Sequence, residues 1–291
     1  MKLLFWLGLL LCVLVVAAVG MSAYGAKRWK DSTRALTGRL EAARIDDKAQ
    51  PPPLKRYDAR ELEGLPAPVQ RYFRAVLKDG QPIITAATLN IAGTFNLSPT
   101  GEQWKPFTSH QSVVTRRPGF LWDAQIAMLP GVAVRVVDSY IAGEGLLHAA
   151  VQGLFTVADV RGGGELARGE FMRFFAEAAW YPTALLPSQG VRWEAADDRS
   201  ANATIADGPL TLTLLFRFNN AGLIESFRAE ARGAGVGKEM LMLPWEGRWS
   251  NYQVRDGMTV PFTGEVAWMR PEGRQSYFVG TVTSLSYAFS P

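Results

Sequence analysis

The residues that could carry out acid–base chemistry in this 291-residue chain are few, and several gather in one segment. In VRVVDSYIAGEGLLHAAVQG, Asp138 and Tyr140 fall in phase with the valines of one predicted strand, and His148 falls in phase with apolar residues of the next. If these side chains share a cavity, they could act as acid and base or bind the polar end of a ligand. The alternatives are a buried polar network, or a bulge that turns Asp138 outward.

A second group of polar side chains lies on a predicted helix over residues 165–180. Glu170, Arg173 and Glu177 are three and four residues apart, so they are neighbours on one helix face. The ordinary interpretation is a ladder of surface ion pairs. The functional alternative places Glu177 and Trp180 at the mouth of a cavity, where a carboxylate beside apolar groups would titrate abnormally.

Several kinds of catalytic site are excluded by residue type. The only histidines are His110 and His148, with no metal-binding spacing, so we expect no metal site. The only cysteine, Cys12, lies in an apolar segment, so a cysteine nucleophile is excluded. The glycine-rich stretch from 161 to 164 is not followed by the Lys-Ser/Thr of a phosphate-binding loop, and we expect no cofactor.

The positive net charge is concentrated at the N-terminus. Residues 1–79 hold 14 Lys and Arg against 8 Asp and Glu, whereas residues 80–291 hold 17 against 19. A nucleic-acid-binding surface needs basic side chains in the folded part of the chain. Nucleic acid is therefore excluded as a partner.

The first 26 residues predict a transmembrane anchor. The 22 residues from Leu3 to Tyr24 carry no charge and would span about 33 Å as a helix, enough for the hydrocarbon of a bilayer. The alternative is a cleaved signal sequence, for which Ala23-Tyr24-Gly25 could be the cleavage site. The basic residues that follow favour the cytoplasm. A leader at the extreme N-terminus is nevertheless more often an export signal, so we expect a single-pass protein of the bacterial inner membrane with an extracytoplasmic domain.

The anchor and the folded domain are separated by residues 27–56. A basic juxtamembrane helix is predicted over 27–47, which is either a solvated spacer or a surface attracted to anionic headgroups. Pro51, Pro52 and Pro53 then predict a stiff linker. A single domain is expected over residues 57–291.

Alternating hydrophobicity dominates this domain. After a short predicted helix at 66–78, period-two segments recur to the C-terminus, joined by turns such as Pro130-Gly131 and Asp256-Gly257. We count roughly ten strands, including weaker candidates at 103–116, 146–159, 191–197 and 201–207, interrupted by the helix at 165–180. The prediction is an α+β fold in which an antiparallel sheet curls into an open β-barrel, with one or two helices against its concave side or mouth.

Aromatic side chains indicate what such a half-barrel could hold. Seven tryptophans lie in the domain, and although most must be core, large side chains lining a partly open cavity suit a hydrophobic guest. We expect the lining to include Trp122, Tyr140, Phe175 and Trp180, with Asp138 and His148 orienting the polar end of the ligand.

Some segments resemble a known family. These include PGFLWDAQIAM, ELARGEFMRFFAEAAWYPTALLP and PWEGRWSNYQVRDGMTVPFTGEVAW, and the resemblance covers about residues 65–288. They are similar to a bacterial, membrane-anchored family of uncharacterised proteins, a domain of unknown function, which implies no activity. More distantly, the architecture is similar to the LolA/LolB-like half-barrels of lipoprotein carriers and receptors, which implies an apolar cavity for acyl chains.

The sequence thus favours a membrane-anchored domain of the cell envelope that binds a hydrophobic or lipid-like ligand, rather than an enzyme. One alternative is an enzyme acting on a small amphiphile with Asp138, His148 and Glu177 as acid–base groups, which requires these side chains to converge in one cleft. Another is a scaffold without a ligand, which would expose a large apolar patch on a convex face.

Overall fold

The computed structural model describes residues 2–45, 56–98, 101–236 and 239–290. Its α-helices are α1 (Lys2–Ile45), α2 (Ala67–Val76) and α3 (Gly164–Ala176). Its short 3-10 helices are η2 (Ala59–Leu62), η3 (Glu177–Trp180), η4 (Pro182–Leu185) and η5 (Pro187–Gln189). Its strands are β1 (Ile84–Asn96), β2 (Trp104–Val114), β3 (Gly119–Leu129), β4 (Val132–Ile141), β5 (Glu144–Val151), β6 (Phe155–Gly162), β7 (Arg192–Asp197), β8 (Ser200–Asp207), β9 (Leu210–Phe218), β10 (Ile224–Val236), β11 (Glu239–Arg255), β12 (Met258–Arg270) and β13 (Gly273–Phe289).

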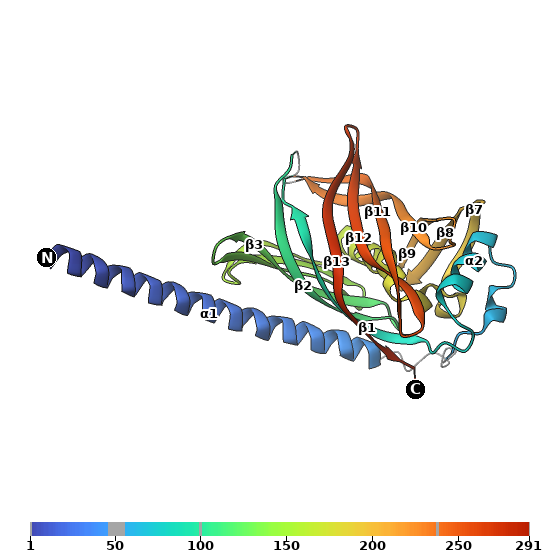
Figure 1. Ribbon diagram of the computed structural model, residues 1–291, viewed down its shortest axis with the longest axis horizontal. Coiled ribbons are helices and arrows are strands. Elements are labelled where there is room, and N and C mark those ends of the chain that lie inside the picture. The colour runs from blue at the N-terminus through green and yellow to red at the C-terminus, as the bar shows by residue number, and fades with distance from the viewer. Residues whose placement is uncertain (1, 46–55, 99–100, 237–238, 291) are drawn as a thin grey trace.

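The strands form one antiparallel sheet that curls without closing (Figure 1). Its order is β6-β5-β4-β3-β2-β1-β13-β12-β11-β10-β9-β8-β7, so β6 and β7 are the free edges and β1 pairs with β13 in the middle. The predicted open antiparallel barrel is confirmed. The sheet has 13 strands rather than roughly ten, partly because the predicted strand at 146–159 is two strands, joined by a turn in which Gln152 and Gly153 have positive φ.

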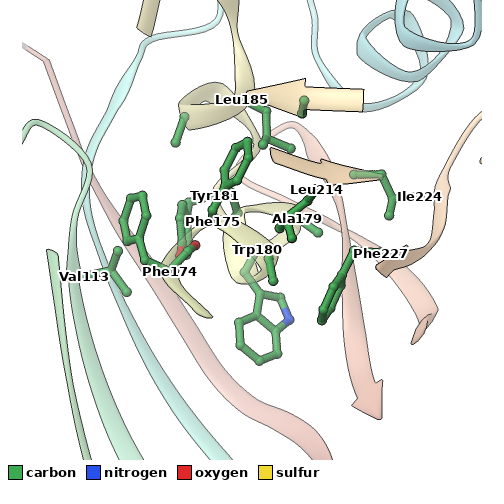
Figure 2. Close-up of a cluster of buried hydrophobic side chains, with 14 of the residues drawn as sticks. Val113, Phe174, Phe175, Ala179, Trp180, Tyr181, Leu185, Leu214, Ile224 and Phe227 are labelled. Atoms are coloured by element: carbon green, nitrogen blue, oxygen red, sulfur yellow. The ribbon is translucent and has the colours of Figure 1, made fainter. Parts of the chain in front are cut away.

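Helix α3 and the 3-10 helices after it fill the concave side of the sheet. They connect the two edge strands, and their apolar side chains form the centre of the core with residues from β9 and β10 (Figure 2). Phe174, Phe175, Trp180 and Tyr181 are almost fully buried there. The predicted helix against the concave side is therefore confirmed, although its last turn, Glu177–Trp180, is a 3-10 helix.

Helix α1 lies against the convex side of the sheet. The predicted anchor and juxtamembrane helix form one continuous helix, and its first twenty residues make no contact with the domain. From Gly25 onward, every third or fourth residue is buried or half-buried, and Trp29, Leu40 and Ala43 pack against apolar residues of β2 to β5. The second half of α1 is therefore part of the domain. The predicted proline linker lies outside the described residues.

Candidate functional site

Four of the predicted site residues line one cavity on the concave side. This cavity, which we call the concave cavity, has a volume of about 100 Å³. Its predicted members are Trp122, Asp138, Glu177 and Trp180, contributed by β3, β4 and η3. The remaining lining residues are Phe95, Arg173, Phe227, Arg232, Trp245, Trp249, Gly264, Val266, Tyr277 and Phe278. The walls are thus mainly aromatic and the charged groups are few.

The expectation that His148 shares this cavity is wrong. The turn between β4 and β5 has two residues, so an even-numbered residue of β4 pairs with an odd-numbered residue of β5. Asp138 therefore pairs with Leu147, while His148 pairs with Val137 and points to the opposite face. There its ring stacks on Trp29 of α1, with ring centroids 5.3 Å apart.

Tyr140 and Phe175 face the concave side, but they belong to the core and do not line the cavity. Tyr140 is fully buried, stacks on Phe171 and donates a hydrogen bond of 2.6 Å to Asp207. Phe175 is fully buried edge-on against Phe216. Their role in the structure is packing.

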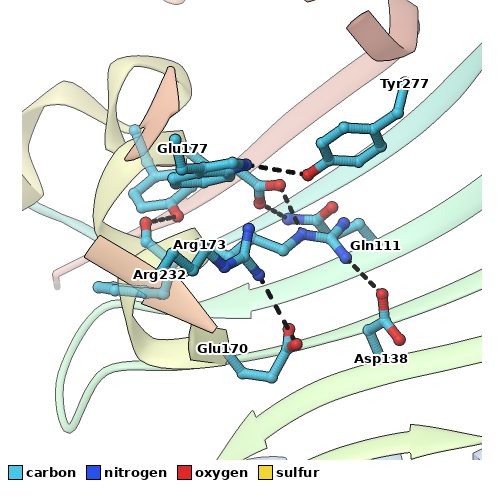
Figure 3. Close-up of polar contacts among 10 residues, drawn as sticks. Gln111, Asp138, Glu170, Arg173, Glu177, Arg232 and Tyr277 are labelled. Carbon is cyan, nitrogen blue, oxygen red and sulfur yellow. Dashed lines mark hydrogen bonds and ion pairs between the residues drawn. The ribbon is translucent and has the colours of Figure 1, made fainter. Parts of the chain in front are cut away.

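The acidic and basic residues of α3 form a buried network, not a surface ladder (Figure 3). The guanidinium of Arg173 donates hydrogen bonds of 2.8 Å to Glu177 and 2.9 Å to Asp138. Gln111 of β2 donates to the second oxygen of Glu177 at 2.6 Å. Arg173 also lies over the ring of Trp122, 4.7 Å from its centroid. The carboxylates of Asp138 and Glu177 are therefore both held by Arg173.

Arg232 is the charged residue of this cavity that the sequence did not predict. Simple alternation along β10 from Phe227 and Ala229 would place Ala231 on the concave face. A bulge between Ala229 and Arg232 shifts the phase by one residue and turns Arg232 inward. No feature of the sequence signals this bulge.

The guanidinium of Arg232 is stacked between aromatic rings and is weakly paired. It lies 4.1 Å from the ring centroid of Trp245 and 5.9 Å from that of Trp268. Its nearest carboxylate is Glu170, at 3.8 Å, and within the described chain it makes no hydrogen bond. Because a guanidinium has five N–H donors, Arg232 has donors to offer a ligand.

Burial keeps two of the nearby carboxyl groups from ionising readily. Desolvation, together with the charge of Asp138, raises the pKa of Glu170 to about 8. Desolvation also raises the pKa of Asp138, although Arg173 opposes the shift. At neutral pH Glu170 is therefore mainly protonated, and the positive charge of Arg232 is left without a full counterion.

Further polar atoms at the cavity lack partners. The indole nitrogens of Trp122, Trp180 and Trp249, and one carboxylate oxygen of Asp138, are buried without a hydrogen bond to any described residue. Each such atom costs free energy unless a ligand or water satisfies it. Over the described ranges, no group of three His, Cys, Asp or Glu residues could hold a metal ion. The cavity therefore holds four buried polar atoms that a ligand or water could satisfy.

The comparisons with known proteins identify a family but no activity. Residues 63–287 match a family of unknown function, DUF6920. The chain belongs to this family. The predicted resemblance is therefore confirmed, and it extends over almost the whole domain. A search of the curated proteins finds no match.

Two solved structures are similar to this DUF6920 member at low TM-scores. A LolA superfamily protein from Nitrosomonas europaea is 11% identical, covering 77% of this chain and 94% of its own, with a TM-score of 0.40. A beta-barrel-like protein of domain of unknown function DUF1849 from Brucella abortus is 10% identical, covering 71% and 99%, with a TM-score of 0.24. At these TM-scores and identities the likeness carries no argument about what this chain does.

Proposed function

We propose that this protein binds an amphiphile in the concave cavity, with the polar head on Arg232 and the tail along the aromatic wall. The observation that carries the proposal is Arg232 itself, a buried guanidinium stacked on Trp245 without a hydrogen bond to any described residue. Guanidinium donors suit a carboxylate, a phosphate or an ester carbonyl. We therefore expect a ligand with such an acceptor at its head.

The size of the cavity limits what it accepts. A volume of about 100 Å³ is well below the 300 to 1,000 Å³ that is usual for drug-sized ligands. The head and the start of the tail fill it, and the rest of the tail extends over the partly exposed aromatic side chains of Phe95, Trp268 and Phe278. A fully enclosed acyl chain would require the core to open.

The enzyme and scaffold alternatives have less support. The proposed acid–base set required Asp138, Glu177 and His148 in one cleft, and His148 lies on the other face of the sheet. The scaffold required an exposed apolar patch on the convex face, where α1 packs with Trp29 and Leu40. Binding is therefore the function that the geometry favours.

The amphiphile proposal is tested by what co-purifies with the full chain. We expect mass spectrometry to find a stoichiometric amphiphile with an acidic or ester head on the wild type and to find it depleted from Arg232→Gln. Arg228→Gln is the matched control, because Arg228 lies on the same strand and pairs with Glu230 at the surface. Equal ligand occupancy in both variants, or no ligand on the wild type, would contradict the proposal.

We also propose that Leu3–Tyr24 is an uncleaved anchor in the bacterial inner membrane, with the domain on the extracytoplasmic side. This part of α1 is long and apolar enough to cross a membrane, and all of its residues except the half-buried Ser22 are exposed. The candidate cleavage site at Gly25 is helical and packed against the domain, which disfavours a peptidase. The intact mass of the purified chain tests whether the N-terminal segment is cleaved. Labelling of Ser250→Cys by an impermeant maleimide, in a chain carrying Cys12→Ala, tests the side of the membrane.

A further inference from the structure

A second and larger pocket lies on the opposite side of the sheet, between α1 and strands β4 to β6. We call it the helix groove; its volume is about 410 Å³. Its basic residues are Arg28, Arg39 and Arg161. Its other lining residues are Trp29, Ser32, Thr33, Ala35, Leu36, Val137, Leu146, His148, Gly153, Leu154, Thr156 and Asp159. The groove is separate from the concave cavity because the sheet lies between them.

The start of the groove coincides with the end of the apolar segment. At Gly25, an added Cβ would lie 2.2 Å from the carbonyl oxygen of Gln152, so the helix and the β5–β6 turn are in close contact. Gly25 directly follows Tyr24, the last residue of the uncharged stretch. Arg28 lies four residues beyond Tyr24, about 6 Å along the helix axis. That distance falls within the headgroup layer, roughly 5 to 8 Å thick on each side of the hydrocarbon.

Exposed apolar side chains lie at the end of the domain where Gly25 contacts the β5–β6 turn. Leu129 and Phe155 are 68% and 65% exposed, beside the β3–β4 and β5–β6 turns. The two turns are joined, because the side chain of Gln152 donates a hydrogen bond of 2.6 Å to the carbonyl of Gly131. In Figure 1, the free half of α1 leaves the domain beside the end of β3. These side chains therefore lie at the end of the domain from which the apolar half of α1 extends.

The groove combines three arginines and the carboxylate of Asp159 with an apolar floor. Arg28 has no side-chain partner in the part of the chain that the structure describes. Arg161 pairs with Asp159 through Nε and Nη2, which leaves its Nη1 available. Leu36, Leu146 and Leu154 supply the apolar surface. Cationic donors above apolar side chains, at headgroup depth, match the chemistry of an anionic lipid.

We propose that the helix groove binds the phosphate headgroup of an anionic phospholipid from the adjacent leaflet. Arg28 and Arg161 bind the phosphate, and the acyl chains pass Leu154 into the bilayer beside the free half of α1. The proposal rests on the anchor proposed above, because only an inserted α1 brings the groove to the headgroups. A bound lipid would hold the domain in one orientation on the membrane.

The test uses the full chain in nanodiscs of phosphatidylcholine with a minor share of phosphatidylglycerol. After release into detergent, native mass spectrometry measures the phosphatidylglycerol retained. We expect the double variant Arg28→Gln with Arg161→Gln to retain at least about tenfold less than the wild type, since each lost hydrogen bond to a charged group weakens binding by about tenfold or more. Lys27→Gln with Lys30→Gln is the matched control, since it removes the same charge from α1 residues outside the groove. This control is expected to retain phosphatidylglycerol.

Three results would overturn the proposal. Equal loss in both double variants would indicate diffuse attraction to the membrane, and equal retention would show that the groove arginines are not used. Displacement of phosphatidylglycerol by millimolar inorganic phosphate would assign the groove to free phosphate. Failure of the anchor is a separate outcome, because the chain would then be lost from the nanodiscs before any lipid is measured.

Discussion

The indole of Trp29 donates a hydrogen bond of 2.8 Å to the carboxylate of Asp123, and this bond joins α1 to the convex face of the sheet. The same indole stacks on His148 and is almost fully buried. Asp123 carries a raised pKa because of its burial, so the indole N–H also satisfies a carboxyl group that water reaches poorly. The second half of α1 is therefore held by specific contacts and is not a solvated spacer.

Removing this contact should loosen the helix. We expect Trp29→Ala to lower the free energy of unfolding by about 3 to 5 kcal/mol, the usual cost of deleting a buried tryptophan. Trp6→Ala is the matched control, because Trp6 is 62% exposed and should leave the domain unchanged. Urea unfolding of the full chain in detergent measures both. An equal effect of the two substitutions on the free energy of unfolding would show that Trp29 does not hold α1 against the sheet.

The two glycines of α1 that flank Tyr24 should respond to alanine with opposite signs. At Gly20 an added Cβ meets nothing within 4 Å, so alanine should stabilise the helix by about 1 kcal/mol through its higher helix propensity. At Gly25 the Cβ would meet the Gln152 carbonyl at 2.2 Å, so alanine should push α1 off the sheet. Hydrogen exchange of residues 26–45 should speed up in Gly25→Ala alone. Unchanged exchange would contradict the close contact.

Arg173 should be far more important for stability than a surface arginine. Arg173→Met leaves Asp138 and Glu177 buried without their cation, which we expect to cost about 3 to 5 kcal/mol. Arg192→Met removes an exposed pair with Glu194 and should cost less than about 1 kcal/mol. Denaturant unfolding measures the free energy of unfolding of both variants. Similar losses of unfolding free energy in the two variants would show that water reaches the Arg173 network.

Glu170 should make stability and ligand binding depend on pH. Its pKa is 4.5 in the unfolded reference and about 8 in the fold, so between these values the folded protein holds one more proton. The free energy of unfolding should then decrease as pH rises, by at most about 1.4 kcal/mol per pH unit, and level off above pH 8. Glu170→Gln should lose this slope. If Glu170→Gln kept the wild-type dependence of unfolding free energy on pH, the extra proton of the folded state would belong to another group.

Ionisation of Glu170 should also weaken ligand binding, because Glu170 lies beside Arg232. Above pH 8 the ionised Glu170 faces Arg232, Arg173, Asp138 and Glu177, and it competes with an anionic head for Arg232. We expect dodecyl phosphate, measured by tryptophan fluorescence, to bind more weakly as pH rises from 7 to 9. Glu170→Gln should bind with little change over that range. Weakening of equal size in the variant would contradict a role for Glu170.

Periodicity in the sequence predicts most of this fold. The alternation in β3, β4 and β9, and the turn at Asp256-Gly257, place strands and hairpins where the structure has them. Helix α3 follows from its apolar spacing. The turn at Gln152-Gly153 was missed because a non-glycine residue with positive φ is not typical of a turn.

The site was predictable only where a single strand decides the direction of a side chain. Trp122 and Asp138 face inward as their own strands indicate. Whether His148 faces the same side of the sheet depends on how β4 pairs with β5. The sequence of one strand carries no information about that pairing. Arg232 depends on a bulge, and the burial of Glu170 and Arg173 depends on the whole sheet curling around α3. Register and curvature are tertiary properties, so local patterns could not supply them.

The pairing of β1 with β13 has a consequence for how the protein is made. β1 ends at Asn96 and β13 begins at Gly273, so the two strands at the middle of the sheet are far apart in the chain. Until translation delivers the last strand, β1 and β12 each lie at an unpaired edge of the sheet. Long-range pairing of this kind folds slowly and leaves such edges open to aggregation. We therefore expect a chain that stops before β13 to leave no stable product, because β1 and β12 then lack the strand that joins them.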